Sequence, residues 1–592
     1  MTWNANGILG KLGELKVFLK MHDVDIMLIT ETKLLKTDKI NIDPYNILRK
    51  ERNTDTRGGG VAILVKHGIP YIKAQVAANE IECTAIKLSN NIVIAVVYNR
   101  PCNKYKIESI RKICNTHNNI IIGGDLNSKH IDWGNNSNNT NGITLHNLIN
   151  SSNIIHKSPV LTHTLSNNSD PSTIDFFLLK NITNYTIAHT LHELPSDHYP
   201  VEMHINDITR QNLDKYIHSY KNTDWKQFRN TLDSTIKINP NINTTLEIDT
   251  EITKFTTALI RARNKHSKYI KINQDRSTIP DEILEHIKNR NKTRKLYQRT
   301  GNNTYKVQLQ NLNRTIKTQL TQHKNERWEN ILKKATTRDN SLWKIAKSRT
   351  KKRSEIPPLI DTNTEAISDE QKSECLASHF QQVHNNNFAN NTEHINIENI
   401  IDNIIRQPTQ TDKDYIKTII TNPNEVGCIL RKLKTNKATG EDQIDNMILK
   451  NISRKTTVQL TYIINSILKL NHFPDQYKTA IVVPIPKAGK SLNKKENFRP
   501  ISLLNSISKV IEKIMYRRFN TFLDEHNITQ DSQFGLKNHH NTTQQIARIS
   551  NDILLNFNQD KNTVFTLLDI EKPLIEFGSK VFYIKCTKLG LM

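Results

Sequence analysis

The sequence predicts a layered α/β fold for residues 1–204, followed by a basic helical linker over 205–355 and a further folded region over 356–592. Three observations lead to this division. In the first region, short apolar runs alternate with helical or loop stretches, which is typical of strands buried in a layered core. The middle region has few glycines and sparse apolar positions among Lys, Arg, Gln and Asn. Apolar helices return after Pro357 and Pro358, and 592 residues are too many for one core.

The elements within these regions follow from apolar periodicity. Apolar positions at helical spacing predict a helix over 12–19, and a second apolar helix is expected over 458–470. Continuous apolar runs bounded by Asn, Gly, Pro and Ser predict strands. The predicted strands lie at 24–29, 61–65, 92–98, 120–122, 174–179, 479–484 and 563–570.

Charge is unevenly distributed along the chain. There are 83 Lys and Arg against 58 Asp and Glu, a net charge of +25. Residues 261–353 contain 26 basic and 7 acidic residues, so their net charge of +19 is about three quarters of the total excess. A field this concentrated favours polyanions, nucleic acid above all. The plain alternative is a solvated helical surface.

Cysteine usage and hydropathy exclude several classes of protein. The six cysteines are scattered without a C-x-x-C pair, which argues against a disulfide framework or a zinc knuckle and fits a reducing compartment. No apolar run approaches the ~20 residues that span a bilayer, so no membrane partner is expected. The first residues, polar by Asn4, do not resemble a signal peptide.

Acidic, amide and imidazole side chains recur where predicted strands end. Glu31 follows the run 25–29, and Asp125 and Asn127 follow 120–122. Two residues apart on an extended strand, Asp125 and Asn127 would project from one face. Asp197 adjoins His198. Alone, each cluster is as well explained by a helix start, a turn or a buried histidine. Together they suit Mg²⁺, which takes hard oxygen ligands, and a phosphodiester whose developing charge needs donors.

The first region resembles the exonuclease-endonuclease-phosphatase superfamily, specifically the apurinic-endonuclease-like endonuclease of non-LTR retrotransposons. Residues 129–130 and 133–134 resemble its insect jockey-like branch. The matching segments are 3–7 (WNANG), 29–32 (ITET), 98–101 (YNRP), 123–127 (GGDLN), 162–163 (TH), 173–175 (TID) and 196–198 (SDH).

This resemblance implies a four-layered α/β sandwich with a catalytic site at its rim. It implies that Glu31 binds the metal with support from Asn4, and that Asp125 activates or orients the attacking water with help from Asn127. Which group is the general base stays open. The start of the chain two residues before Trp3 predicts a short first strand, which would weaken the support from Asn4.

The remaining candidate residues also come from the resemblance. Tyr98 and Thr162 would contact the phosphate or position their neighbours. Asp175 and Asp197 would anchor the network, Asp197 being a second candidate metal ligand, and His198 would stabilise the phosphorane.

The last region resembles the fingers and early palm of a non-LTR reverse transcriptase. The matching segments are 437–442 (KATGED), 498–504 (FRPISLL), 533–537 (QFGLK) and the strand-like 563–570. By this resemblance Lys487 and Arg499 contact nucleotide phosphates, and Asp569 is a vestigial metal ligand of the palm.

The sequence after Asp569 departs from the reverse transcriptase pattern. Pro573 and Leu574 stand where Ala and an aromatic residue are expected, and Pro disfavours a strand or helix interior. The second catalytic Asp-Asp turn, the thumb and a zinc knuckle do not appear before residue 592. We therefore expect an incomplete right-hand polymerase, truncated at the C-terminus and without RNA-directed DNA polymerase activity.

The predicted function is a Mg²⁺-dependent DNA endonuclease, with Mn²⁺ able to substitute, that nicks target DNA and leaves a 3′-hydroxyl primer. Target DNA and element RNA are the expected partners, with no small-molecule cofactor. The run 347–353 predicts a nuclear destination after synthesis in the cytoplasm, and its Lys351, Lys352 and Arg353 are candidate nucleic-acid contacts.

Two alternatives remain from the sequence. One is a catalytically dead, nucleic-acid-binding remnant of a retroelement. The other is a cellular relative, such as an abasic-site repair enzyme or a phosphatase, against which the block 498–504 argues.

Overall fold

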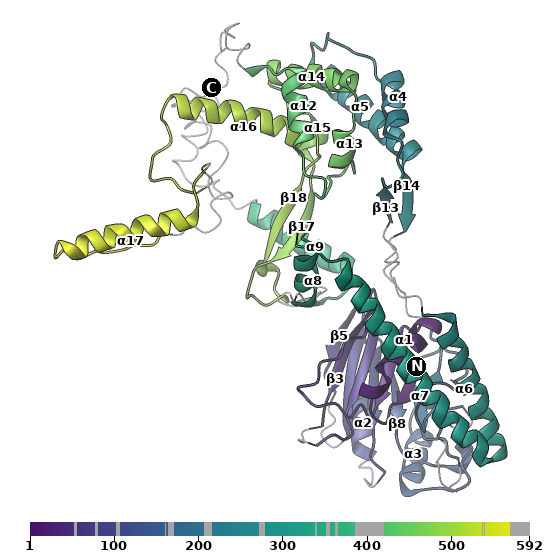
Figure 1. Ribbon diagram of the computed structural model, residues 1–592. Helices are drawn as coiled ribbons and strands as arrows, with labels where there is room; N and C mark the ends of the chain where they lie inside the picture. Colours follow the sequence, from purple (N-terminus) through teal and green to yellow (C-terminus); the bar gives the residue numbers. More distant parts are fainter. Residues whose placement is uncertain are drawn as a thin grey trace. The chain divides into compact units, whose positions relative to one another are not determined.

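The computed structural model divides the chain into two compact units, which are described separately (Figure 1). The first comprises residues 1–214, 273–375 and 491–495, and the second 215–272, 376–490 and 496–592. The structure describes residues 1–52, 56–76, 81–101, 107–159, 162–163, 171–206, 216–271, 279–337, 340–350, 356–360, 365–384, 419–535, 537 and 539–568.

Two six-stranded mixed sheets form the centre of the first unit. In the first sheet β1 and β2 are parallel and the other neighbours antiparallel. In the second, β7 and β8 are the parallel pair. The first sheet has the order β11(His189–Thr190), β12(Val201–Glu202), β1(Thr2–Asn4), β2(Ile26–Thr30), β4(Val61–Lys66), β3(Tyr45–Lys50). The second has the order β5(Tyr71–Ala74), β6(Glu82–Leu88), β7(Val93–Tyr98), β8(Ile120–Asp125), β10(Asp175–Lys180), β9(Ile155–Lys157).

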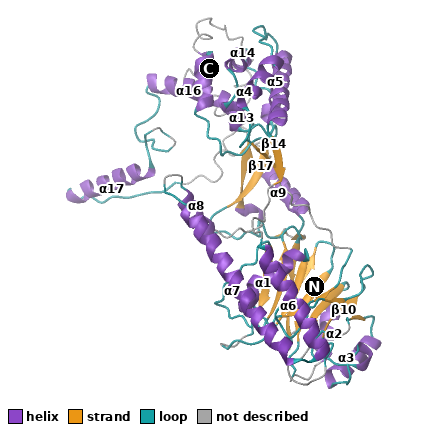
Figure 2. Cartoon of the chain, turned by 45° about the vertical axis from the view of Figure 1, so that its right-hand side comes forward, coloured by secondary structure: helices purple, strands orange, loops and turns teal. Residues whose placement is uncertain are grey.

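The sheets face each other across an apolar core and carry helices on their outer faces. Leu28 and Ile63 of the first sheet pack with Val96 and Phe177 of the second. The outer helices are α1(Leu12–Met21) on the first sheet and α2(Ile107–Thr116) and α3(Thr140–Asn150) on the second (Figure 2). Strands β4 and β8 are buried along their whole length, which explains why only apolar residues and glycines precede their last residues, Lys66 and Asp125. The expected α/β layering is confirmed.

A helical hairpin extends this unit beyond residue 204. It consists of α6(Asp281–Thr300) and α7(Asn303–Lys333), joined at Gly301, whose φ of 64° ends α6 in the left-handed conformation. Ile283, Ile287 and Ile316 form a small core with Val17 of α1. Part of the predicted basic linker is therefore packed onto the sandwich.

The rest of the expected linker is divided between the units. The first unit also contains α8(Ser341–Thr350), β15(Leu359–Ile360) and β16(Glu365–Ala366), whereas α4(Trp225–Thr235) and α5(Thr245–His266) lie in the second. The domain boundaries at 204/205 and 355/356 stay predictions.

The second unit is mainly helical. Its core packs α4 and α5 against α12(Pro423–Arg431), α13(Asn446–Lys450), α14(Arg454–Lys469), α15(Asp475–Lys478) and α16(Ser508–Glu525). Two antiparallel strand pairs accompany it, β13(Tyr216–Ser219) with β14(Lys268–Lys271), and β17(Ile481–Pro486) with β18(Phe498–Leu503). The other helices within the described residues are α9(Asp369–His384), which includes residues assigned to both units, and α17(Thr542–Asn558).

Most strands expected from the sequence are present, with ends moved by a few residues. The strand over 563–570 is the exception, because residues 563–568 have no regular structure and no described strand pairs with them. Since a strand needs a hydrogen-bonded neighbour, its apolar run does not suffice. Among the described helices, none is both long and apolar enough to cross a bilayer.

Candidate nuclease site

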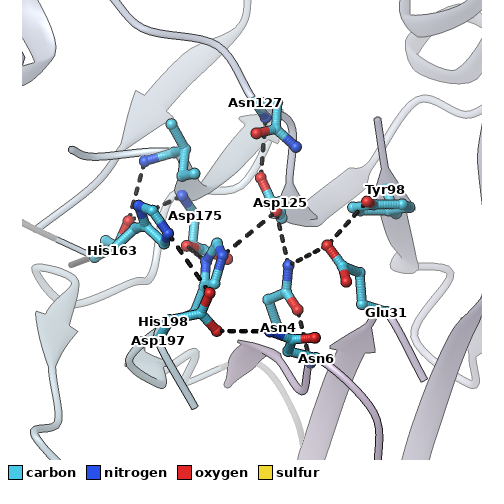
Figure 3. Close-up of polar contacts among 12 residues, drawn as sticks. Asn4, Asn6, Glu31, Tyr98, Asp125, Asn127, His163, Asp175, Asp197 and His198 are labelled. Carbon is cyan, nitrogen blue, oxygen red and sulfur yellow. Dashed lines mark hydrogen bonds and ion pairs between the residues drawn. The ribbon is translucent and has the colours of Figure 1, made fainter. Parts of the chain in front are cut away.

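The strands that carry the predicted site residues end at one rim of the two sheets (Figure 3). In the second sheet Asp125 closes β8, opposite Tyr98 of β7 and Asp175 of β10. In the first sheet Asn4 is the last residue of β1 and pairs with Thr30, the last residue of β2. Glu31 comes directly after Thr30. The pairing register therefore brings side chains far apart in sequence to one place.

Asn4 connects the two sheets through its side-chain amide. Its Nδ2 donates to Glu31 Oε1 at 3.1 Å and to Asp125 Oδ2 at 2.8 Å. The first strand is short, three residues, but it pairs on both sides, and the amino terminus of Met1 donates to Ile26 O at 2.8 Å. Asn4 is completely buried, so the short strand does not leave it unsupported.

Glu31 leaves β2 in the left-handed conformation, with φ of 48°. This turn directs its carboxylate toward the second sheet, where Tyr98 Oη donates to Oε1 at 2.9 Å. Lys33 Nζ lies 3.5 Å from Oε2. Burial, and then the charge of Glu31, raise the pKa of Tyr98, so Tyr98 stays a neutral donor. Both roles expected for Tyr98, contact with the phosphate and positioning of its neighbours, stay predictions.

Asp125 is presented where β8 runs unusually close to β7. A Cβ on Gly124, whose φ is 149°, would lie 2.0 Å from Val97 O, so only glycine allows this approach. Burial, and then the charge of Asp175, raise the pKa of Asp125 to about 7. The carboxylate is thus held in a desolvated position beside a like charge.

The expected placement of Asn127 beside Asp125 on an extended strand is wrong. The strand ends at Asp125, and Asn127 has φ of 48°, so the chain turns there. Its backbone N–H donates to Asp125 Oδ1 at 3.0 Å, while its side-chain Nδ2 donates to Asn99 O at 2.7 Å. Asn127 therefore supports Asp125 through its backbone, and its amide ties two rim loops together.

Asp175 and His198 form a buried pair. His198 Nδ1 lies 2.7 Å from Asp175 Oδ2, and its Nε2 lies 4.0 Å from Asp125 Oδ2. Burial lowers the pKa of His198, but Asp175, then Asp125 and Asp197, outweigh it and raise the pKa to about 9. Thr162 Oγ1 accepts the backbone N–H of Ile174 at 3.0 Å and of Asp175 at 3.1 Å. Thr162 therefore contacts the backbone of Asp175, and its expected role stays a prediction.

Asp197 is held by residues that were not singled out as site residues from the sequence. Asn6 Nδ2 donates to its Oδ1 at 3.2 Å, and His163 Nε2 lies 3.8 Å from its Oδ2. Burial raises the pKa of Asp197, but His163, the charge of His198 and the bond from Asn6 hold it well below its usual range. Asn6 and His163 both lie within the quoted motifs 3–7 and 162–163, so their position next to Asn4 and Thr162 was the available signal.

All nine predicted endonuclease residues thus belong to one network in the first unit. The polymerase-type candidates are placed differently. In the second unit Lys487 Nζ donates to Glu496 O at 2.9 Å, and Arg499 is an exposed residue of β18 opposite Ile485. Lys351, Lys352, Arg353 and Asp569 lie outside the described residues.

The donor set fits a divalent cation. Asp125, Asp175 and His198 offer ligand atoms within 4.8 Å of one another, and so do His163, Asp197 and His198. Asp175 Oδ1 is buried and has no hydrogen-bond partner among the described residues. Such carboxylate oxygens are the hard ligands that Mg²⁺ and Mn²⁺ take. Glu31 lies outside both groups and reaches them through Asn4, so its role as a ligand stays a prediction.

Family models match two parts of the chain. Residues 92–202 match the endonuclease-reverse transcriptase model, and residues 485–573 match the model for reverse transcriptase, an RNA-dependent DNA polymerase. The first match covers Tyr98, Asp125 and His198, and the second includes Lys487 and Arg499.

Curated relatives align with nearly the whole chain. A probable RNA-directed DNA polymerase from transposon X-element of Drosophila melanogaster is 28% identical over 600 residues, covering 97% of this chain and 64% of the relative. The RNA-directed DNA polymerase from mobile element jockey of Drosophila funebris is 25% identical over 591 residues, covering 96% and 63%. The chain thus spans less than two thirds of these relatives' lengths.

Solved structures that are similar to part of this chain include the endonuclease domain of TRAS1, a telomere-specific non-LTR retrotransposon. It is 18% identical and covers 35% of this chain and 96% of that domain, with a TM-score of 0.30. The two family models match separate stretches of the chain, the endonuclease-reverse transcriptase model first and the reverse transcriptase model after it. The chain is thus similar along nearly its whole length to RNA-directed DNA polymerases of mobile elements, and it contains one stretch that matches an endonuclease-reverse transcriptase model and one that matches a reverse transcriptase model.

Proposed function

We propose that the first unit is a Mg²⁺-dependent DNA endonuclease that nicks one strand and leaves a 3′-hydroxyl. The observation that carries this proposal is the amide of Asn4, which holds Glu31 and Asp125 together at the rim next to the Asp175–His198 pair. Carboxylates that accept a proton and a cationic imidazole that donates to a phosphoryl oxygen are what phosphodiester hydrolysis needs.

The proposed reaction uses Asp125 as the group that receives the proton of water. Asn4 and the backbone N–H of Asn127 hold its two oxygens, so the carboxylate cannot rotate away from the attacking water. Water attacks phosphorus, the bond between phosphorus and the 3′-oxygen breaks, and that oxygen takes a proton to become the 3′-hydroxyl. The phosphate stays on the 5′ end of the fragment downstream of the nick.

His198 stabilises the charge that develops on phosphorus. Asp175 accepts from Nδ1, which leaves Nε2–H to donate on the side of the site where Asp125 lies. A bound divalent cation would add Lewis-acid stabilisation of the phosphoryl oxygens. Glu31 and Asp197 are the side chains that we propose to hold it, with Asn4 and Asn6 fixing their orientation.

Nicking of supercoiled plasmid by the full chain tests this function. We expect Mg²⁺-dependent conversion to nicked circles, loss of conversion with EDTA, and recovery with Mn²⁺. A separate DNA polymerase should extend the nick without prior phosphatase treatment, since it carries a 3′-hydroxyl. Asp125→Ala should abolish nicking. Absence of nicking in the wild type, or nicking unchanged by Asp125→Ala, would disprove the proposal.

The alternative of a catalytically dead, nucleic-acid-binding remnant is decided by the same preparation. Both hypotheses predict DNA binding through the basic residues of 261–353, with affinity that falls steeply as salt rises. Binding without cleavage in Mg²⁺ and in Mn²⁺ would favour the remnant. Target DNA and element RNA are the proposed partners in either case.

The reverse transcriptase domain is present by sequence, and we propose that it is inactive. The proposal rests on Pro573 and Leu574 after Asp569, all of which lie outside the described residues. Incorporation of labelled dTTP on poly(rA) primed with oligo(dT) would contradict it.

A further inference from the structure

We propose that helix α6 is a working part of the nuclease site, with Arg294 as a positioning residue for the loop that carries Asp197 and His198. The inference rests on the proposed nuclease function of that site. It concerns a residue outside the region 1–204 to which the sequence confined the catalytic machinery.

Arg294 contacts the loop both before and after the two site residues, Asp197 and His198. Its Nη1 donates to Leu194 O at 2.6 Å and to Glu193 O at 3.4 Å, and its Nη2 donates to Ser196 O. Its guanidinium carbon lies 4.7 Å from the ring centroid of Tyr199. The planar fork of arginine suits this task, because it can serve several carbonyls while stacking on an aromatic ring.

The loop needs such support because its backbone is strained and because the side chains of Asp197 and His198 must be held in fixed positions. Leu194 is bulky yet has φ of 60°, a conformation that non-glycine residues rarely adopt. Beyond it, Ser196 Oγ donates to Asn4 O at 2.9 Å, so the loop is tied to the strand that carries the central amide. A shift of the loop would therefore move Asp197, His198 and Asn4 together.

Helix α6 is itself fixed to the sandwich, so Arg294 acts from a rigid base. Ile283, Ile287, Arg290 and Arg294 are spaced by four, three and four residues and share one helix face. The two isoleucines pack with Val17 of α1. Arg290 is 1% exposed, and its Nη2 lies 2.5 Å from Glu14 Oε1 of α1. Removal of either partner of this ion pair would leave an unpaired buried charge, so the pair holds α6 in one position against α1.

The same face of α6 borders a cavity that opens beside the site. The cavity has a volume of about 420 Å³, and its lining includes Asp197 and Asn6 from the sandwich and Arg290 and Arg294 from α6. Helix α6 thus supports the loop and also forms one wall of the cavity beside the site.

Plasmid nicking by full-length variants tests the proposal. Arg294→Gln should lower kcat by about 10²-fold, the usual effect of displacing reacting groups by about an ångström. Arg294→Lys should recover part of this loss, because an ammonium keeps the charge but lacks the planar fork that bonds the carbonyls while stacking on Tyr199. Arg299→Gln removes the same charge from an exposed position of α6. The two glutamine variants should change KM alike, since both weaken attraction to DNA, and only Arg294→Gln should lower kcat.

Hydrogen exchange of the peptide that covers residues 191–201 gives a readout independent of catalysis. We expect faster exchange in Arg294→Gln and unchanged exchange in Arg299→Gln. If Arg294→Gln and Arg299→Gln have equal kcat values and equal exchange rates in this peptide, the proposal is overturned. If Arg294→Gln does not fold, Arg294→Lys decides, and wild-type kcat and exchange in that variant would overturn it. A wild type that does not nick refutes the nuclease function, whereas the exchange comparison still decides whether Arg294 holds the loop.

Discussion

The side-chain amide of Asn4 lies 2.8 Å from the carboxylate of Asp125, and this bond joins two sheets that share no strand pairing. The same Nδ2 also donates to Glu31, so one buried amide sets the separation of the two carboxylates. Precision at the site therefore depends on how the sheets pack as much as on the local loops.

Replacing Asn4 with alanine should separate Glu31 and Asp125. We expect Asn4→Ala to lower kcat for plasmid nicking by about 10²-fold, because the carboxylates lose their common donor and the positions of the reacting groups become less exact. Asn118→Ala, at an exposed position, controls for general effects of amide removal. Similar rates for the two variants would show that Asn4 has no part in alignment.

The pairing of Asp175 with His198 can be tested by removing only the negative charge of Asp175. Asp175→Asn keeps the size of the side chain but cannot stabilise a cationic imidazole, so kcat should fall by about 10²- to 10⁴-fold. Steady-state nicking by the full chain measures this, with circular dichroism to verify folding. A folded variant with wild-type kcat would exclude His198 as the group that meets the developing charge.

The proposed role of Glu31 in holding the cation predicts a changed metal requirement. Glu31→Gln should raise the Mg²⁺ concentration for half-maximal nicking by at least about tenfold, as loss of ligands or their supports commonly does. Glu108→Gln removes a carboxylate from an exposed pair with Arg111 and is the matched control. An unchanged Mg²⁺ titration in Glu31→Gln would assign the cation to other side chains.

In the second unit, stability should depend on pH through Glu425. Arg518 donates to both of its carboxylate oxygens, at 3.0 and 2.5 Å, and this pairing lowers the pKa of Glu425 from its usual 4.5. The stabilisation is present above pH 4.5 and is lost as pH falls through the lower pKa of the folded state.

Glu425→Gln should therefore destabilise this unit at pH 7 by about 1 kcal/mol, the usual value for a solvent-accessible pair. The difference from wild type should shrink on acidification. Hydrogen exchange of peptides from α12 and α16 at several pH values measures it, with Glu441→Gln as an exposed control. A difference that grows toward acid pH would contradict the assignment.

The sequence by itself determined the local elements and most of the site. Buried strands such as β4 and β8 are recognisable because every position before the last is apolar or glycine, and the polar residues that close them, Lys66 and Asp125, are conspicuous after such runs. Within each sheet those ends share an edge, which a pattern of strands already implies, whereas the meeting of the two edges depends on how the sheets pack. The family resemblance then supplied residue roles that spacing alone did not.

Only the tertiary structure decided which atoms meet. Asn127 departs from the extended geometry that its spacing from Asp125 suggested, because β8 ends at Asp125 and the backbone turns at Asn127, whose φ is 48°. Asn6 and His163 join the site through contacts with Asp197, 191 residues from Asn6 in sequence. Arg294 reaches the loop from a helix that composition marked only as basic. These outcomes depend on long-range packing between sheets and helices, which leaves no local periodicity in the chain.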